Sequence, residues 1–191
     1  LVALIGPSGS GKSSFLHLLS LLDKPSAGKI LLLGKDCKNF DENQKNRIRR
    51  EKISIIFQDN NLLSDFTTVE NVLMPLIIRG ENYQTSFEKA KNVLRQVNLL
   101  ERINHFPNEL SGGEQQRVAI ARSIIAETDL VLADEPTGNL DFKTSKDVFS
   151  YFAKLKKLKK TVLFATHNRE LANKADYKLS ISNGNIKRVN A

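Results

Sequence analysis

The 191-residue sequence is poor in cysteine, in tryptophan and in long apolar runs. Its single cysteine, Cys37, cannot form an internal disulfide, and the chain does not open on the charged and apolar segments of a signal peptide. These absences favour the reducing cytoplasm over a secreted, disulfide-bonded domain. The apolar run from Val72 to Ile78 contains a proline and is far shorter than the roughly 20 residues of a membrane-spanning helix. We therefore do not expect the chain to cross a bilayer by itself.

The sequence also has fewer acidic than basic residues, with 21 Asp and Glu against 29 Lys and Arg. Its net charge is therefore +8 at pH 7 with neutral histidine. A basic balance favours nucleic acid or an anionic membrane as a partner. The lysines are spread along the chain, however, and the densest run, residues 154–160 (KLKKLKK), has leucines three apart, as on the solvated face of a helix. We therefore expect no nucleic-acid partner. With 40% hydrophobic residues, a chain of this length buries one substantial core.

Short apolar runs alternate with segments of helical spacing along most of the chain. Buried strands are predicted at residues 1–5 and 53–57, and further strands at 29–34, 130–133 and 161–166. Helices are predicted at residues 15–22, 87–97 and 143–157, and an exposed loop with a helix at 35–52. Near the end, the pair Asn183-Gly184 in an alternating segment indicates a hairpin. This order predicts an α/β fold with a mostly parallel sheet flanked by helices, whose ligands bind at the carboxyl ends of the strands.

Residues 59–107 lack such strands, and we expect them to form an α-helical subdomain inserted into the sheet domain. The prediction is a single domain over residues 1–191, with a core made by residues 1–58 and 108–191. The last helix of the subdomain is expected to continue to about residue 127.

A glycine-rich loop connects the first predicted strand to the first predicted helix. Its residues 6–13, GPSGSGKS, fit the phosphate-loop pattern G-x-x-x-x-G-K-[ST], which predicts a P-loop NTPase. Glycine allows the tight curl that turns successive N–H groups inward around an anion. Lys12 can reach the β- and γ-phosphates, and the Ser13 hydroxyl can bind Mg²⁺. The expected nucleotide-binding residues of this loop are Gly6, Pro7, Ser8, Gly9, Ser10, Gly11, Lys12, Ser13 and Ser14.

Two adjacent carboxylates, Asp134 and Glu135, follow the apolar run LVLA. Like charges side by side are costly unless a cation or a reacting group uses them. If this strand neighbours the strand of the phosphate loop, Asp134 can hold Mg²⁺ through water and Glu135 can polarise an attacking water. A solvated acidic pair at a turn is the alternative.

The stretch LSGGEQQRVAIAR, residues 110–122, begins a second helix suited to an anion. Ser111 and Glu114 have the spacing of a capping box. A cap alone does not require the two glycines, Gly112 and Gly113, which permit close backbone approach to a phosphate at the positive end of the helix dipole. We therefore predict a second phosphate-contacting segment, with a plain helix cap as the alternative.

In this order, the motifs resemble the nucleotide-binding domain of ABC transporters over essentially the whole chain. The further matches to that family are Gln58 after ISIIF, GNLD at residues 138–141 and His167 after TVLFAT. FQDNNLL and PTGNLD resemble the branch that contains the lipoprotein-releasing, macrolide-exporting and cell-division ATPases, and we expect lipoprotein release first among these. The resemblance implies a Mg²⁺-dependent enzyme that converts ATP and water to ADP and phosphate and couples this reaction to transport.

The resemblance also implies a role for each matching residue. Glu135 and His167 would be catalytic, with His167 gripping the γ-phosphate, and Asp141 would lie at the subunit junction. Gln58 would contact ATP and sense the membrane partner. The Mg²⁺ ligands would be Ser13, Gln58 and Asp134. In a head-to-tail homodimer, the residues that face the ATP of the other copy would be Ser111, Gly112, Gly113, Glu114 and Gln115.

Two further implications concern the partner and the fold. Transmembrane permease subunits would contact residues Gln58 to Val72 at the cytoplasmic face of the inner (plasma) membrane, where the protein would be peripheral. Leu62, Leu63 and Phe66 are apolar residues in this polar loop, and packing within the subdomain is the alternative for them. Family members stack adenine on an aromatic residue in a strand upstream of the phosphate loop. We expect this aromatic residue and the N-terminal antiparallel strands to be missing here, which would expose a sheet edge.

Two other classes of protein compete with a transporter ATPase. A soluble ABC ATPase that acts on nucleic acid or the ribosome would suit the basic charge. Chromosome-type members, however, carry a very long coiled coil between the phosphate loop and the signature segment, LSGGE in this chain. Here only about one hundred residues, without heptads, separate Lys12 from Ser111. Translation-type members usually hold two such domains in one chain, so both observations favour a transporter ATPase. A third alternative, a phosphate-loop kinase, does not explain the segment LSGGE or the adjacent carboxylates Asp134 and Glu135.

Overall fold

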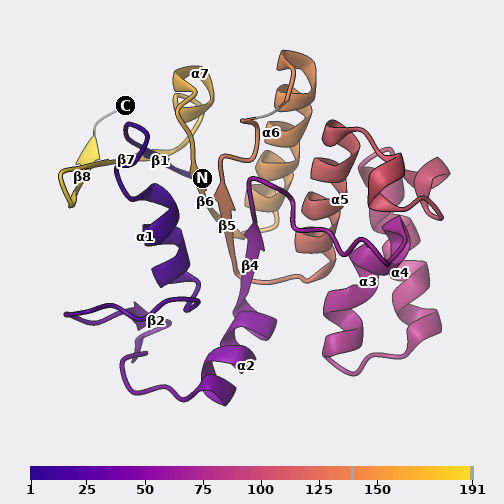
Figure 1. Cartoon of the computed structure of the whole chain (residues 1–191), viewed down its shortest axis with the longest axis horizontal. Helices are drawn as coiled ribbons and strands as arrows, with labels where there is room; N and C mark the ends of the chain where they lie inside the picture. The colour runs from indigo at the N-terminus through magenta and orange to yellow at the C-terminus, as the bar shows by residue number, and fades with distance from the viewer. Residues whose placement is uncertain (139, 190–191) are drawn as a thin grey trace.

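The computed structural model describes residues 1–138 and 140–189 (Figure 1). Its centre is a six-stranded sheet in the order β4-β5-β6-β1-β7-β8, in which all neighbours are parallel except β7 and β8. The strands are β1 (Val2–Ile5), β4 (Ile53–Ile56), β5 (Leu130–Asp134), β6 (Thr161–Ala165), β7 (Tyr177–Ser182) and β8 (Asn185–Val189). The predicted α/β class with a mostly parallel sheet is confirmed.

The central strands are buried on both faces, which explains their unbroken apolar sequences. On one face, Phe164 of β6 and Val131 of β5 belong to the larger hydrophobic core. On the other face, Leu163 and Leu132 pack with Leu16 in a smaller core. Successive residues of each strand therefore alternate between the two cores, and helices have to cover both faces.

Helices flank the sheet and extend beyond one end of it (Figure 1). They are α1 (Lys12–Leu19), α2 (Glu42–Lys52), α3 (Thr68–Ile78), α4 (Tyr83–Gln96), α5 (Gly112–Ile125), α6 (Phe142–Lys157) and α7 (Arg169–Ala172), with 3₁₀ turns at Leu100–Arg102 and Pro107–Glu109. The predicted helices at 87–97 and 143–157 correspond to α4 and α6. Within the described residues, no helix combines the length and the apolar character needed to cross a bilayer.

Residues 59–107 form helices and turns, without a strand. α3 and α4 pack against each other and against α5, at the end of the molecule away from α1 (Figure 1). Val72 of α3 and Leu94 of α4 nevertheless belong to the same hydrophobic core as Phe164 in the sheet. Because this core is continuous, a separate subdomain that reaches about residue 127 stays a prediction.

The predicted strand at residues 29–34 is confirmed only in part. Only Leu31–Leu32 form a strand, β2, which pairs antiparallel with Lys35–Asp36, β3, in a separate two-stranded sheet. The chain reverses at Leu33 and Gly34, whose φ angles are 51° and 76°. A run of leucines indicates apolar character but not a reversal within the run, and Leu31 and Leu33 stay exposed.

The predicted hairpin is confirmed, since β7 and β8 pair antiparallel across Asn183 and Gly184. Both turn residues have left-handed φ angles, 48° and 73°, as a tight hairpin turn requires.

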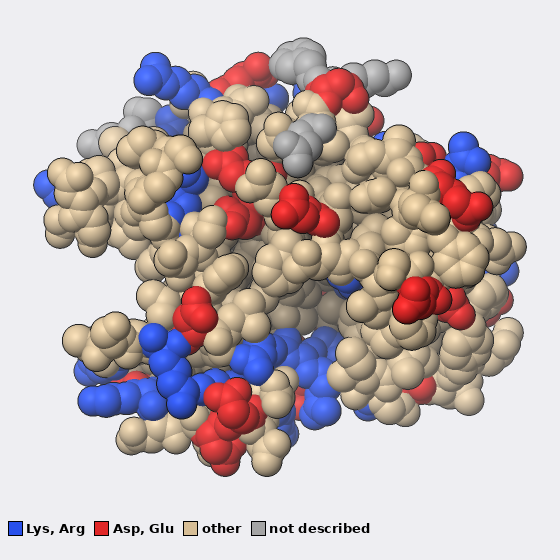
Figure 2. Space-filling model, in the orientation of Figure 1, with Lys and Arg blue, Asp and Glu red and all other residues tan. Residues whose placement is uncertain are grey.

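Basic side chains are less evenly spread than the sequence indicates. Figure 2 shows Lys and Arg gathered in the lower part of one face, where Figure 1 places α2. This helix carries Lys45, Arg47, Arg49, Arg50 and Lys52. The run at residues 154–160 lies at the end of α6, with Leu155 buried and Leu158 exposed, so its lysines are largely solvated as predicted.

The strand that ends in Asp134 does not neighbour the strand of the phosphate loop, contrary to the arrangement considered from the sequence. β6 lies between β5 and β1 and pairs with both. The parallel strands β4, β5, β6 and β1 nevertheless end at one edge of the sheet. Residues that follow β5 can therefore still reach the phosphate loop.

The core around β6 offers a test of this architecture. Phe164 is 1% exposed, and its ring contacts those of Phe149 and Phe152 at centroid distances of 5.9 and 6.0 Å. Phe164→Ala should lower the free energy of unfolding by about 3–5 kcal/mol, because it leaves a cavity between the sheet and α6. Chemical denaturation measures this loss. Leu158→Ala, at a side chain that is 64% exposed, should change the value by less than about 0.5 kcal/mol, and equal effects would contradict the described core.

Candidate functional site

The phosphate loop curls between the end of β1 and the start of α1. Gly9 and Gly11 have φ angles of +74° and +94°, in the left-handed region that other residues rarely adopt. Gly6 is needed for a different reason, because a Cβ atom there would lie 2.5 Å from the carbonyl oxygen of Ile181 in β7. The left-handed backbone at Gly9 and Gly11 and the close packing of Gly6 against β7 thus both require glycine in this loop. Its backbone precedes a helix start, an arrangement suited to phosphate.

Lys12 carries a buried positive charge at this loop. The residue is only 8% exposed. Its Nζ donates to the carbonyl oxygens of Gly6 at 3.0 Å and Pro7 at 3.2 Å, and it lies 3.7 Å from Oε1 of Glu135. A buried ammonium needs such partners, because an unpaired charge in the interior is costly. The ammonium therefore lies between the loop and a carboxylate, in reach of a phosphate bound by the loop.

A cavity of about 590 Å³ opens in front of the loop at the carboxyl edge of the sheet. Segments that follow three strands enter it: Gln58 after β4, Glu135 and Gly138 after β5, and His167 after β6. Its phosphate-loop residues are Ser8, Gly9, Gly11, Lys12, Ser13 and Ser14. The other predicted loop residues, Gly6, Pro7 and Ser10, do not line the cavity.

Gly138 is a lining residue that the sequence analysis did not place in the site. Its N–H donates to the carbonyl oxygen of Glu135 at 2.9 Å, which closes a turn after β5. Its position, three residues beyond Glu135, could have placed it in the site from the sequence, because a glycine leaves room beside that carboxylate.

Glu135 and His167 contact each other in this cavity. Oε2 of Glu135 lies 3.0 Å from Nδ1 of His167 and accepts a hydrogen bond from the His167 N–H at 3.3 Å. Glu135 has a left-handed φ of 42°, and its own N–H donates to the carbonyl oxygen of Ala165 in β6. This backbone is uncommon for a residue other than glycine and is typical of functional sites. A carboxylate, an imidazole and the Lys12 ammonium are thereby brought together.

Asp134 ends β5 beside Glu135. Its Oδ1 is buried and has no hydrogen-bond partner among the described residues, which is costly unless a cation or a water satisfies it. Ser13 and Gln58 contribute a hydroxyl and an amide to the neighbouring cavity. The described residues hold no group of three or more His, Cys, Asp or Glu side chains suited to a metal. The donor set fits Mg²⁺ beside phosphates, because that ion takes few protein ligands.

The predicted capping box at the start of α5 is confirmed. Oγ of Ser111 accepts the N–H of Glu114 at 3.3 Å, while Oε2 of Glu114 accepts the N–H and the hydroxyl of Ser111, each at 2.8 Å. The hydrogen bond from the Ser111 backbone is the main cause that lowers the pKa of the Glu114 carboxyl, and the Arg102 guanidinium at 3.1 Å contributes.

This helix start lies outside the cavity of its own phosphate loop. None of the described residues 111–115 lines that cavity, whereas Gly112 and Gln115 line a second one of about 210 Å³. Ser111 and Gly112 are exposed. Nε2 of Gln115 donates to the carbonyl oxygen of Pro107 at 2.9 Å. The helix start therefore lines a neighbouring cavity, which shares Gln58, Glu135 and Gly138 with the cavity of the phosphate loop.

Asp141 is the N-cap residue of α6. Its carboxylate accepts the N–H of Thr144 at 3.0 Å and the hydroxyl of Thr144 at 2.7 Å. Thr144 in turn packs against α5, because a Cβ atom on Gly113 would lie 3.0 Å from its methyl group. Asn139 of the GNLD segment lies outside the described residues. A role for Asp141 at a subunit junction stays a prediction.

The lowered pKa of Glu114 predicts a pH-dependent contribution to stability. Because the folded pKa lies below the ordinary value of 4.5, the ionised carboxylate stabilises the fold fully above that pH, and the contribution is lost as the pH falls through the folded pKa. Glu114→Ala should therefore be less stable than the wild type at neutral pH, by about 0.5–2 kcal/mol. Denaturation at a series of pH values should show the gap closing only in acid. A gap that does not vary with pH would contradict this, and Glu88→Ala on α4 is the control.

Comparison with known proteins identifies the family. Residues 1–138 match the family described as ABC transporter. The chain is 47% identical to the lipoprotein-releasing system ATP-binding protein LolD of Rickettsia bellii, over 94% of this chain and 80% of that protein. It is 43% identical to an uncharacterized ABC transporter ATP-binding protein of Thermotoga maritima, over 98% of this chain and 80% of that protein.

Among solved structures, the chain resembles the ATP-binding cassette MJ0796, in a dimeric, post-hydrolysis state bound to ADP and Pi. The TM-score is 0.92 and the identity 35%, over 100% of this chain and 86% of that one. Sequence and structure thus agree. The chain belongs to the ABC transporter family, as an ATP-binding subunit of a kind that hydrolyses ATP.

Proposed function

We propose that this chain is the ATPase subunit of a lipoprotein-releasing transporter, peripheral at the cytoplasmic face of the inner membrane. Its 47% identity to a lipoprotein-releasing system ATP-binding protein supports this cargo. The segments FQDNNLL and PTGNLD, which resemble the same branch of the family, support it as well.

Two copies would form the working enzyme. The observation that carries this proposal is that the helix start at residues 111–113, exposed at Ser111 and Gly112, does not line the cavity of its own phosphate loop. Head-to-tail pairing would bring this helix start to the γ-phosphate held by Lys12 of the other copy. The helix dipole and the open space around Gly112 favour an anion there. The similar cassette MJ0796 is a dimer bound to ADP and Pi, which supports this assembly.

ATP would be held by the phosphate loop and Gln58. Ser13, Gln58 and, through water, Asp134 would hold Mg²⁺, for which the unpartnered Oδ1 of Asp134 and the Ser13 hydroxyl are suited. When bound, this ion neutralises phosphate charge. Lys12 would exchange its hydrogen bonds to loop carbonyls for stronger ones to phosphate oxygens.

Glu135 would act as the base toward the attacking water. Its carboxylate faces the cavity between Lys12 and His167, where it can accept a proton from water in front of the γ-phosphate. The contact between Nδ1 of His167 and Oε2 of Glu135 orients the imidazole and leaves Nε2 to contact the γ-phosphate. After hydrolysis the γ-phosphate no longer joins the two copies, which would couple turnover to transport.

Glu135→Gln removes the proposed base and keeps its size. Hydrolysis by the full-length chain should fall by about 10²–10⁴-fold, while ATP still binds because Lys12 and the loop are unchanged. A phosphate-release assay, together with titration of a fluorescent ATP analogue, measures both quantities. Glu88→Gln on α4 is the matched control and should keep wild-type turnover. Full activity of Glu135→Gln would remove Glu135 from the proposed role.

The membrane partner would contact residues Gln58 to Val72. Leu63 and Phe66 are exposed apolar side chains of this segment. Leu62 is partly buried against the core, so packing accounts for it. We therefore infer a contact surface centred on Leu63 and Phe66.

Leu63→Asp places a carboxylate on this surface. It should reduce co-purification with the transmembrane subunits at least about tenfold, because an unpaired charge at an interface costs more than about 1.4 kcal/mol. Release of a lipid-anchored protein from reconstituted vesicles should fall in parallel. Leu158→Asp, at an exposed leucine after α6, is the control. Unchanged binding would contradict this surface, and stimulation of hydrolysis by nucleic acid in place of the membrane subunits would contradict the partner class.

A further inference from the structure

The segment that follows Gln58 has a strained backbone. Asn60 and Asn61 have left-handed φ angles of 61° and 45°, a region that Asn tolerates better than most residues but still occupies rarely. Two such residues in succession persist only where surrounding contacts hold them. Gln58 lines both the nucleotide cavity and the smaller cavity beside it. Asn60 and Asn61 therefore lie in the segment that leads away from Gln58.

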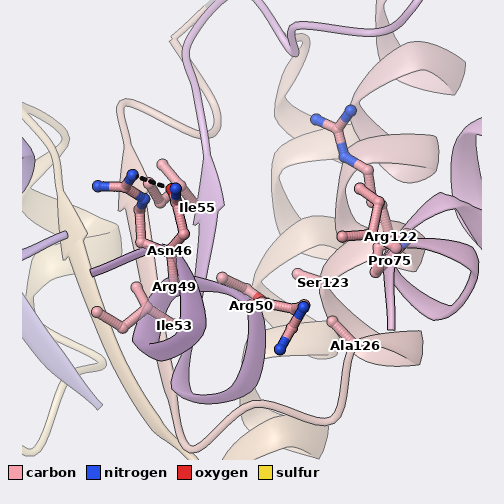
Figure 3. Close-up of a pocket in the computed structure, with 11 residues that line it drawn as sticks. Asn46, Arg49, Arg50, Ile53, Ile55, Pro75, Arg122, Ser123 and Ala126 are labelled. Carbon is pink, nitrogen blue, oxygen red and sulfur yellow. Dashed lines mark hydrogen bonds between the residues drawn. The ribbon is translucent and has the colours of Figure 1, made fainter. Parts of the chain in front are cut away.

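Arg122 of α5 supplies these contacts. Its Nη2 donates to the carbonyl oxygen of Asn60 and its Nη1 to that of Asn61, each at 2.8 Å, across 62 and 61 positions of the sequence. Figure 3 shows the Arg122 side chain leaving α5 and pointing away from Ala126, and both residues line a pocket of about 420 Å³. The hydrogen bonds direct the guanidinium to the segment of Asn60 and Asn61.

The Arg122 guanidinium donates its hydrogen bonds to backbone carbonyl oxygens and not to an acidic side chain. In the part of the chain that the structure describes, its guanidinium forms no ion pair. Burial lowers the pKa of this guanidinium, and the two charge-assisted hydrogen bonds offset the cost of its removal from water. Its planar fork matches two neighbouring carbonyl groups, which the single ammonium of lysine does not. Arg122 therefore fixes a backbone conformation.

Two buried polar side chains of the same two elements line one cavity. Asn60 and Gln116 of α5 are buried, and both line the cavity of about 210 Å³ that Gln58 and Glu135 also line. Oδ1 of Asn60 and Nε2 of Gln116, an acceptor and a donor, have no hydrogen-bond partner among the described residues. Such a pair in one polar cavity suits a shared water. Arg122 thus contacts the segment after Gln58 directly, and Gln116 of the same helix lines a cavity that this segment also lines.

We propose that Arg122 is a positioning residue for ATP hydrolysis, which ties Gln58 to the helix whose start contacts the ATP of the second copy. This inference rests on the proposed function. Arg122 lies about three turns, roughly 16 Å, beyond Ser111 along the axis of one continuous helix. A displacement of the helix start by the partner's ATP therefore moves the segment at Gln58, and changes what Gln58 offers to the nucleotide.

Variants of the full-length chain separate positioning from folding. Arg122→Gln removes the charge and the fork, Arg122→Lys keeps the charge, and Arg95→Gln on the exposed side of α4 is the matched control. The kcat of hydrolysis should fall at least about tenfold in Arg122→Gln and less in Arg122→Lys. The Kd of a fluorescent ATP analogue should change much less than kcat, because Arg122 does not line the nucleotide cavity and the phosphate loop is unchanged. Amide hydrogen exchange over residues 58–62 should become faster in the same order, with or without ATP.

Wild-type kcat in Arg122→Gln would overturn this inference. A loss of ATP binding or of thermal stability that matches the loss of turnover in both Arg122 variants would also overturn it, because it indicates a purely structural role. Absence of turnover in the wild type and in Arg95→Gln would refute the proposed function instead. The exchange measurement still decides in that case, since unchanged exchange over residues 58–62 in Arg122→Gln would refute the link itself.

Discussion

A buried ion pair at the carboxyl edge of the sheet determines how the site is arranged. The Lys12 ammonium needs polar partners in its enclosed position, and loop carbonyls and the Glu135 carboxylate provide them. Glu135 reaches Lys12 across the intervening strand β6 because its backbone turns left-handed and hydrogen-bonds to that strand. The same carboxylate contacts His167. The segments after β1, β5 and β6 are thus joined by one set of contacts, and the ends of parallel strands provide the frame for it.

The two candidate phosphate-binding helix starts, those of α1 and α5, differ in their surroundings. The start of α1 faces a cavity that Gln58, Glu135 and His167 of its own chain also line, whereas α5 begins at an exposed Ser111 outside that cavity and continues into a stretch that is fully buried at Val118, Ala119 and Ile120. A helix that is embedded along its length and open at its start is suited to carry a contact made outside the chain into the core. Arg122, further along the same helix, provides the connection to the segment that bears Gln58.

Features that depend on local chemistry could be predicted from the sequence. The phosphate loop, the Ser111–Glu114 capping box and the hairpin at Asn183 are local, because backbone conformation and near neighbours define them. The order of the strands and the contact of Arg122 were not accessible, since periodicity reports which face is buried and not which element lies next to it. The leucine run at residues 29–34 misled for a related reason, because its reversal depends on Leu33 and Gly34.

In the proposed assembly, a nucleotide is enclosed between two copies of the chain. A structure of the full-length Glu135→Gln variant with Mg²⁺ and ATP tests it most directly. We expect a head-to-tail dimer in which residues 111–113 of one copy contact the γ-phosphate bound by Lys12 of the other. A monomer at high protein concentration, or a dimer in which residues 111–113 lie far from any triphosphate, would contradict it.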